Sequence, residues 1–342
     1  MPVDIDPAQV PVLVVYNMDP AWDMQDRQEV ASVSDRLGRA IAEVGYPTSL
    51  IPVESECIAE HLGPYSPLEH IVLNWCEGVP GVPHSEWMAA DVMDRQGFVF
   101  TGAGASTLRL SQNKYFVKRI LDLSGIPTPE WRLYTRPDSD GWNRFPAIVK
   151  PMSEHCSEGI TRDSVVTNQD DLMRRITYIL DAYQQPAIVE YFIDGREFHV
   201  SLWGNGKLEM LPPAEMDFSL FQDIHDRLCT FEAKFVPGSD PYEKIRTLLP
   251  APLSREELQQ LKRVCSEAYQ AIGCRDYARI DVRYQDGSFF VLDVNPNADI
   301  SDDASMACAA DLAGFSYGEM GSRLIRLAAR RHPIWGESRR TG

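Results

Sequence analysis

The chain is poor in positive charge, and it has no apolar run long enough to span a bilayer. Among its 342 residues, 33 Lys and Arg stand against 50 Asp and Glu, which gives a formal net charge of −17. Phosphate backbones are bound through clustered Lys and Arg, so this balance argues against a general nucleic-acid-binding protein. Neither nucleic acid nor a membrane is expected as a partner.

Paired cysteines and a secretion signal are also lacking. The seven cysteines form no Cys-x-x-Cys pair, which favours reduced thiols over a disulfide framework or a zinc site. The opening residues, Met-Pro-Val-Asp-Ile-Asp, show neither the basic start nor the apolar core of a signal peptide. A cytoplasmic enzyme is therefore expected.

Glycine-rich nucleotide loops are incomplete. Gly102-Ala-Gly104 follows an apolar run, but no third glycine completes a dinucleotide-binding fingerprint, so the segment is interpreted as a turn. The stretch 152–159 is small and polar but too poor in glycine to be a P-loop by itself.

Apolar periodicity predicts an α/β arrangement followed by α+β units. The first hundred residues alternate strands and helices, as βαβ units around a parallel sheet do. A second unit has a helix over 111–123 and a strand ending at Lys150. A third has strands at 187–191 and 197–203, a strand pair around 230–236 and a helix announced by the capping box Ser254-Arg-Glu-Glu257.

Two alternating segments, 279–283 and 291–296, flank an Asp286-Gly287 turn and predict an antiparallel hairpin. A two-residue loop would place Asp281 and Asp293 on opposite faces. A three-residue loop with Gly287 in a left-handed bulge position pairs Asp281 with Asp293 and Arg279 with Asn295. We expect the three-residue loop.

Two carboxylates directly across a strand pair repel unless something positive lies between them. Mg²⁺ suits the position, because it binds one or two carboxylates and completes its shell with water and phosphate oxygens. The alternative is an exposed sheet face with solvated charges.

Further candidates lie at strand and helix ends. Lys114 is near a helix start and Lys150 ends an apolar strand, where a ligand or an acidic partner is expected; the alternative is a surface lysine. Glu190 ends another apolar strand, and Glu197 follows seven residues later. Glu197 either accepts ribose hydroxyls or forms a salt bridge with Arg196 or another base.

The order of these motifs resembles the ATP-grasp superfamily, and within it the D-alanine:D-alanine ligases and their relatives. The resemblance implies three domains, with a parallel-sheet N-terminal domain and ATP held between two later α+β domains. The expected bounds are 1–103 for the N-terminal βαβ domain, 104–189 for the central domain, 190–333 for the C-terminal domain with the metal site, and 334–342 for a tail.

The resemblance also implies roles for particular residues. Arg279 would face an oxyanion and Lys234 the γ-phosphate. Two Mg²⁺ ions, or Mn²⁺ in their place, would be held by Asp281, Asp293 and Asn295. The nucleotide would be bound by Lys114, Lys150, the covering loop with Ser153, Cys156, Ser157 and Gly159, the adenine-framing Glu190, Tyr191 and Phe192, and Glu197 at the ribose.

The implied reaction is ATP-dependent joining of a carboxylate and an amine through an acyl phosphate, with ADP and phosphate released. Glu29 would grip the amino group of the first substrate. The acceptor segment contains Asp299, Asp302 and Asp303, which would repel a carboxylate, so an amine other than D-alanine is expected.

Other features leave alternatives open. Glu77 and His84, after a strand end, are further substrate candidates, with helix capping as the alternative. Cys156 stands where the family places a bridging serine and is interpreted as a small loop residue rather than a nucleophile. A catalytically inactive nucleotide-binding protein and a ligase using a non-amine nucleophile are the competing functions, and a homodimer is expected from the family.

Overall fold

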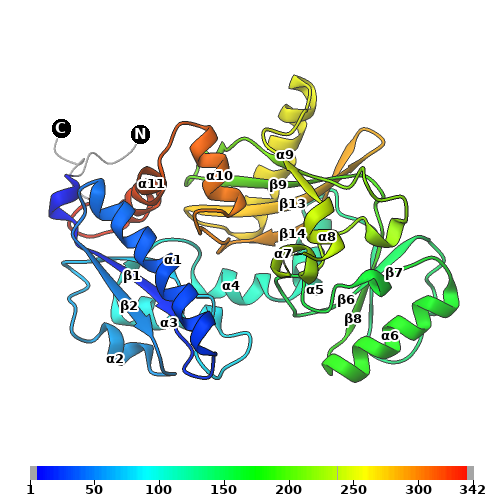
Figure 1. Ribbon diagram of the computed structural model, residues 1–342, viewed down its shortest axis with the longest axis horizontal. Helices are drawn as coiled ribbons and strands as arrows, with labels where there is room; N and C mark the ends of the chain where they lie inside the picture. Colours follow the sequence, from blue (N-terminus) through cyan, green and yellow to red (C-terminus); the bar gives the residue numbers. More distant parts are fainter. Residues whose placement is uncertain (1–5, 237, 337–342) are drawn as a thin grey trace.

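The computed structural model describes residues 6–236 and 238–336, without the side chains of residues 234 and 235, and these residues form three sheets (Figure 1). The N-terminal sheet is parallel, in the order β2-β1-β3-β4. Its strands are β1 (Val12–Asn17), β2 (Thr48–Val53), β3 (Ile71–Trp75) and β4 (Val99–Phe100).

The two later sheets are antiparallel. The central sheet runs β5-β8-β6-β7, with β5 (Trp131–Tyr134), β6 (Ala147–Pro151), β7 (Val165–Val166) and β8 (Ala187–Tyr191). The C-terminal sheet runs β12-β11-β9-β13-β14, with β10 also paired to β9. Its strands are β9 (Arg196–Trp203), β10 (Glu209–Met210), β11 (Ala214–Asp217), β12 (Arg246–Leu248), β13 (Tyr277–Gln285) and β14 (Ser288–Asn295).

Helices connect and cover these sheets. They are α1 (Met24–Glu43), α2 (Ile58–Leu62), α3 (Glu86–Gln96), α4 (Ala105–Ser111), α5 (Lys114–Leu123), α6 (Gln169–Tyr183), α7 (Phe231–Phe235), α8 (Asp240–Lys244), α9 (Arg255–Ile272), α10 (Ser305–Leu312) and α11 (Tyr317–Ala329), with short 3₁₀ turns η1 (Pro7–Gln9), η2 (Arg162–Ser164) and η3 (Ile224–Asp226). In the described part of the chain, no helix is long and apolar enough to cross a membrane.

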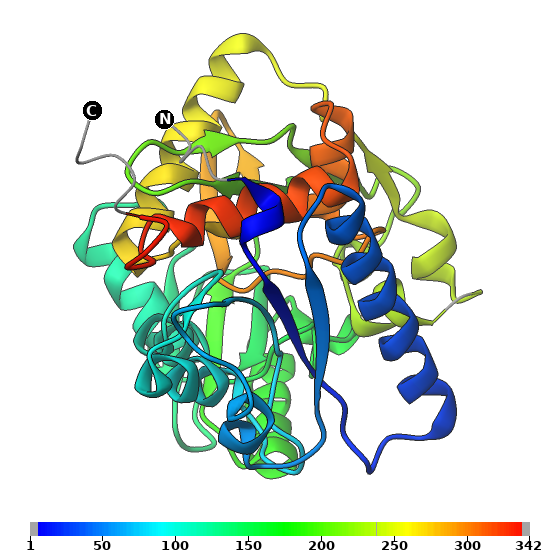
Figure 2. The same cartoon turned by 90° about the vertical axis from the view of Figure 1, so that its left-hand side faces the viewer.

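The central strands β1 and β3 of the N-terminal sheet are almost continuously apolar because helices cover both faces of the sheet. Val12 and Val14 of β1 pack with α1 and α11, whereas Leu13 and Val15 pack with α2 and α3. Figure 2 shows α11 lying across the N-terminal strands beside α1. The last helix of the described chain therefore completes the core of the first sheet.

One face of the C-terminal sheet packs against helices, which leaves the opposite face for polar side chains. Ile280 and Val282 on β13, and Val291 and Val294 on β14, pack with α5 and α9. The polar residues that alternate with them on the hairpin consequently point to the opposite face of the sheet.

Several local expectations can be compared directly with this architecture. The capping box at Ser254 and Glu257 is confirmed. The expected strand pair around 230–236 is wrong, because this segment forms α7, whose first turn is capped by the Thr230 hydroxyl accepting the amide of Ala233 at 3.1 Å. The helix expected over 111–123 is α5 and begins at Lys114 with Asn113 as its cap, because Ser111 ends the preceding helix α4. Residues 337–342 of the expected tail lie outside the described residues.

Candidate active site

The hairpin of β13 and β14 brings the predicted pairs together. Arg279 lies opposite Asn295 and Asp281 opposite Asp293, as expected. The expected three-residue loop is wrong: Gln285 pairs with Ser288 across a two-residue turn in which Asp286 and Gly287 have φ of 50° and 78°. Positive φ at both positions is typical of a type I′ turn.

A β-bulge reconciles the short turn with the observed pairs. Val282 pairs with Val291 but Asp281 pairs with Asp293, so Leu292 is an extra residue on β14. One extra residue reverses the face of every side chain beyond it. The bulge thus moves Asp293 onto the face that carries Asp281.

On this face Asp281 is held by two side chains. Arg279 donates to both of its carboxylate oxygens, from Nε at 2.8 Å and from Nη2 at 3.1 Å, and Asn295 Nδ2 donates to Oδ2 at 3.1 Å. Burial lowers the pKa of Arg279, but Asp281 and Asp293 raise it by more, so the pKa lies above its ordinary value. The oxygen donors of Asp281, Asp293 and Asn295 fit Mg²⁺ by their chemistry.

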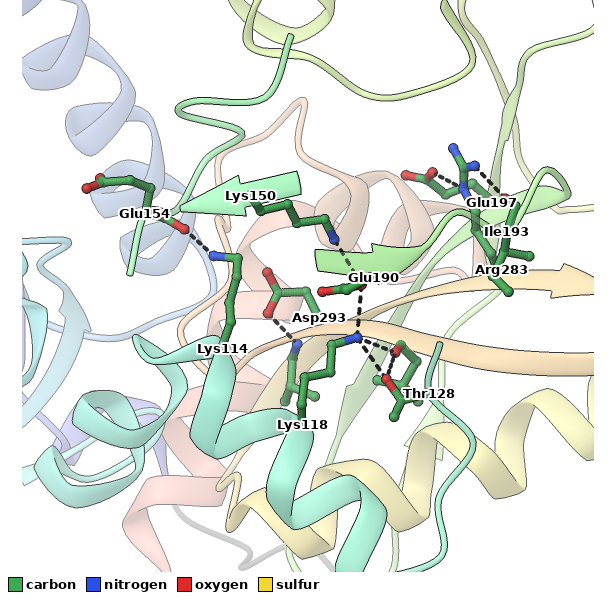
Figure 3. Close-up of polar contacts among 12 residues, drawn as sticks. Lys114, Lys118, Thr128, Lys150, Glu154, Glu190, Ile193, Glu197, Arg283 and Asp293 are labelled. Carbon is green, nitrogen blue, oxygen red and sulfur yellow. Dashed lines mark hydrogen bonds and ion pairs between the residues drawn. The ribbon is translucent and has the colours of Figure 1, made fainter. Parts of the chain in front are cut away.

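Three lysines approach the hairpin, Lys114 and Lys118 from α5 and Lys150 from β6 of the central sheet (Figure 3). Lys118 Nζ donates to Thr128 Oγ1 at 2.8 Å and pairs with Glu190 at 3.1 Å, and Lys150 pairs with the same carboxylate at 3.3 Å. Lys114 donates to the backbone oxygen of Glu154. Burial lowers the pKa of both Lys114 and Lys118, and nearby carboxylates offset only part of this effect.

Glu190 is the anion between these lysines. Burial raises its pKa, but the ion pairs with Lys118 and Lys150 outweigh burial and bring the pKa below its ordinary value. Within the described residues, its second oxygen, Oε1, is buried without a hydrogen-bond partner. Lys118 did not emerge from the sequence, although it lies one turn after Lys114 and so on the same face of α5.

The expected adenine and ribose residues are placed as follows. The guanidinium of Arg144 lies 4.2 Å from the ring centre of Tyr191, and that of Arg283 lies 4.5 Å from the ring centre of the buried Phe192. Arg283 also donates to Glu197 Oε2 at 2.8 Å. The open alternative of a salt bridge for Glu197 is therefore realised, with Arg283 rather than Arg196 as the base.

The loop 152–159 connects all three layers. Cys156 and Ser157 have φ of 52° and 64°, in the left-handed region, and Gly159 follows at 73°. Ser157 Oγ donates to the backbone oxygen of Cys229 at 2.8 Å. From the N-terminal layer, His84 Nε2 lies 3.5 Å from Glu154 Oε1.

The same loop lies against the lysine cluster and the hairpin. The amide of Ser153 donates to Gln185 Oε1 at 3.0 Å. Burial, together with the charge of Lys114, lowers the pKa of His155 to about 4. Cys156 is close enough to Arg279 to interact with it electrostatically. Strained backbone beside charged groups is typical of ligand-binding loops.

Carboxylates gather where the N-terminal layer meets the segment after β14, and Glu77, Glu86 and Asp299 are called the acidic cluster. The Glu77 side chain is exposed to solvent, and partial desolvation by the surrounding protein, together with the nearby Asp299, raises its pKa to about 7. Burial raises the pKa of Glu86 to about 8, with Glu77 adding to the rise and a hydrogen bond with Asn297 opposing it. Glu86 was not predicted, since the first residue of a helix is also a favourable place for a purely stabilising acid.

The remaining candidates lie elsewhere. Asp302 forms a bidentate pair with Arg36 of α1 at 2.9 and 3.0 Å, so its carboxylate is engaged between layers. Asp299 Oδ1 accepts the amide and hydroxyl of Ser301, both at 2.8 Å. Glu29 is exposed on α1, and the side chain of Lys234 lies outside the described residues.

Comparison with known proteins places this geometry in a family. Residues 121–326 match the family described as D-ala D-ala ligase C-terminus. The uncharacterized protein y4sG of Sinorhizobium fredii is 30% identical over 307 residues, covering 88% of each chain. The D-alanine–D-alanine ligase of Pseudothermotoga lettingae is 29% identical over 239 residues, covering 70% of this chain and 75% of the relative.

A solved structure agrees at the level of the fold. The D-alanine–D-alanine ligase from Bacillus anthracis, crystallised with ATP, superimposes with a TM-score of 0.73 at 18% identity, covering 94% of this chain and 98% of that one. Since the sequence match spans more than half of the chain and the relatives cover most of their own length, the chain belongs to the D-alanine–D-alanine ligase-like family of ATP-grasp ligases.

Proposed function

We propose that this protein is an ADP-forming ligase that joins a carboxylate to an amine through an acyl phosphate, using ATP and two Mg²⁺ ions, or Mn²⁺ in their place. The observation that carries the proposal is the convergence of the hairpin face with the lysine cluster. Asp293 is the carboxylate whose charge acts most strongly on Lys114, and Lys150 lies beside the same helix across Glu190. Phosphoryl transfer needs positive side chains around the phosphates and oxygen ligands that hold Mg²⁺, and the two sets meet here.

The chemistry follows from the weakness of a carboxylate as an electrophile. Phosphorylation by ATP gives it a good leaving group, and Mg²⁺ held by Asp281, Asp293 and Asn295 would offset the charge on the transferring phosphoryl group. Lys114 and Lys150 would neutralise phosphate oxygens, and the loop 152–159 would exclude water from the acyl phosphate. The carboxylate substrate then loses phosphate when the amine attacks.

Arg279 is suited to stabilise the tetrahedral oxyanion formed by that attack. Its pair with Asp281 uses Nε and Nη2, so Nη1 is the guanidinium donor that this pair leaves for substrate. A donor fixed in advance at the developing charge typically contributes about 10²- to 10³-fold in rate.

The acidic cluster supports an acceptor other than D-alanine. Glu77 interacts electrostatically with both Asp299 and Glu86, and desolvation with this repulsion raises the pKa of Glu77 and of Glu86. A carboxylate ligand would add to this repulsion, whereas a cationic group would relieve it. We therefore propose an amine substrate that carries a second positive charge or lacks a free carboxylate.

The test is ADP release by the purified protein with ATP, Mg²⁺ and a matrix of carboxylates and amines, with D-alanine pairs included. Amine-dependent ADP release and amide product are expected with cationic amines and not with D-alanine. Efficient ligation of two D-alanines would overturn the substrate assignment. Nucleotide binding without ADP release in the whole matrix would favour the inactive nucleotide-binding protein.

A matched pair of variants tests the metal face. Asp293→Asn removes the charge of a proposed ligand and is expected to lower kcat by at least about 10²-fold, because charge stabilisation of the phosphoryl group is lost. Asp286→Asn makes the same change in the exposed turn of the same hairpin, where Asn also tolerates positive φ, and should leave kcat unchanged. Equal activities of the two variants would refute the metal assignment.

A further inference from the structure

A second group of metal-ligand side chains lies beside the hairpin. Glu197 and His199 are two residues apart on β9, and Cys229 precedes α7. Their ligand atoms all lie within 4.8 Å of one another, and Glu197 and His199 are more than nine-tenths buried, at 7% and 8% exposure. A carboxylate, an imidazole and a thiol form a mixed donor set that suits a borderline transition metal such as Zn²⁺ better than Mg²⁺.

The carboxylate of Glu197 is oriented by a buried arginine. Arg283 Nε donates to Oε2 at 2.8 Å, and Oε1 faces His199 Nε2 at 4.0 Å. That separation exceeds hydrogen-bonding distance. Zinc binds imidazole nitrogen at about 2.0–2.1 Å and carboxylate oxygen at about 2.0–2.2 Å, so a tetrahedral ion between these two atoms requires them to close to about 3.4 Å, a shift of about 0.6 Å.

The imidazole of His199 is oriented from its other nitrogen. Nδ1 lies 3.2 Å from Ser305 Oγ at the start of α10. With the ring proton on Nδ1 and donated to Ser305, Nε2 presents its lone pair toward Glu197, which is how second-shell partners hold metal-binding histidines.

The third ligand comes from a segment that is itself anchored. The backbone oxygen of Cys229 accepts the hydroxyl of Ser157 at 2.8 Å, so the residue is held to the covering loop. Cys229 is partly exposed, so the site lies next to solvent.

We propose that Glu197, His199 and Cys229 form a binding site for a divalent transition metal, with Zn²⁺ as the best match. Its ligands are distinct from Asp281, Asp293 and Asn295, although His199 pairs with Asp281 across β9 and β13. Three protein ligands leave a fourth tetrahedral position for water or a substrate atom, as in catalytic rather than structural zinc sites. The site shares Glu197 with the proposed ribose contact but requires no turnover, so direct metal binding without nucleotide tests it separately from the ligase reaction.

The experiment titrates the full chain with Co²⁺ in excess Mg²⁺ and without nucleotide, because Glu197 is also the residue proposed for the ribose. We expect tetrahedral visible bands and a thiolate-to-cobalt charge-transfer band, both removed by Zn²⁺. Cys229→Ser should abolish the charge-transfer band. Cys57→Ser is the matched control, since it alters an exposed cysteine on another layer and should keep the band.

Two further variants keep the test decisive. Ser305→Ala should weaken Co²⁺ binding by about 10- to 100-fold while the charge-transfer band persists at saturation. His199→Gln should lose the tetrahedral bands, and it decides the outcome if circular dichroism shows that Cys229→Ser is unfolded. A charge-transfer band that survives in folded Cys229→Ser, or Co²⁺ bound without such a band in the unaltered protein, would overturn the proposal.

Discussion

Lys118 and Glu190 form an ion pair in which each side chain is only 1% exposed. The pair brings together α5 and β8, and Thr128 and the backbone oxygen of Val291 satisfy further hydrogen bonds of the ammonium group. A buried charge keeps its place only while its partners remain, because the interior solvates a lone ion poorly.

Lys118→Met should therefore destabilise the protein by about 3–5 kcal/mol, since it leaves Glu190 with Lys150 alone. Lys262→Met, on the exposed side of α9, should change the free energy of unfolding by less than about 0.5 kcal/mol. Urea unfolding monitored by circular dichroism measures both values. Equal stability of the two variants would show that Lys118 is dispensable to the core.

The acidic cluster predicts a pH dependence of substrate binding. Glu77 has a pKa of about 7 and Glu86 of about 8, so both lose protons as the pH rises from 6 to 9. A cationic amine prefers the ionised carboxylates, and the KM for that amine should fall as the pH rises, by up to about tenfold per unit below these pKa values.

Steady-state kinetics with a substrate whose cationic group stays protonated to pH 9 measures this profile. Glu77→Gln should flatten the profile and raise the KM for the amine at high pH, and the KM for ATP serves as the internal reference. A KM for the amine that rises with pH would contradict the acidic cluster as its binding site.

Sequence reasoning correctly expected an acidic partner for Lys150, which pairs with Glu190, and the position of Asp281 opposite Asp293; their roles toward a nucleotide and a metal stay predictions. It did not find Lys118 or Glu86, whose importance arises from burial against other elements. It grouped Asp302 with the acceptor segment, whereas Arg36, which is 266 positions away in the chain, takes its carboxylate. Such distant partners leave no local signal.

At the scale of elements, the alternation of apolar and polar residues predicted which residues of the hairpin face each other, but not the type of turn that joins the strands. The pairing of Asp281 with Asp293 was predictable because the polar residues of both strands must share one face. The turn that produces this pairing was not predictable, because a two-residue turn with a bulge and a three-residue turn give the same pairs beyond Leu292. Similarly, the apolar and polar alternation of 230–236 does not show that Thr230 caps a helix there.

Deleting Leu292 tests the bulge. The strands should still pair, but Asp293 and Asn295 would move to the opposite face or force a slip of the whole strand, and turnover should fall below detection. Leu292→Val keeps the extra residue and should retain activity. ADP release and Mg²⁺-dependent thermal shifts of both variants give the answer, and full activity after the deletion would show that the bulge does not set the face.

At the scale of the whole molecule, α11 ties the end of the described chain to its beginning. Gly318 lies where α11 meets α1, and a Cβ at this position would come within 2.1 Å of the backbone oxygen of Ala40. The parallel sheet and the two antiparallel sheets could be expected from periodicity and resemblance. The return of α11 to the first sheet could not, because its apolar stripe would fit either neighbouring sheet equally well.

Gly318→Ala should destabilise the protein by about 1–3 kcal/mol, because the two helix backbones must separate. Gly78→Ala is the comparison, as its Cβ would meet Ser85 Oγ at an ordinary 3.6 Å. Thermal unfolding followed by circular dichroism should show a lower midpoint for Gly318→Ala alone. An unchanged midpoint would mean that α1 and α11 adjust without cost.

The position of α11 also has a consequence for how this protein is made. Val12, Val14, Leu37 and Ile41 belong to a core that includes Leu324 and Ile325 of α11. On the ribosome the first sheet and α1 emerge long before that helix, so the part of this apolar face that α11 covers stays exposed until α11 has emerged. The N-terminal layer therefore cannot complete its core before that point, and a nascent chain with exposed apolar surface is prone to aggregation.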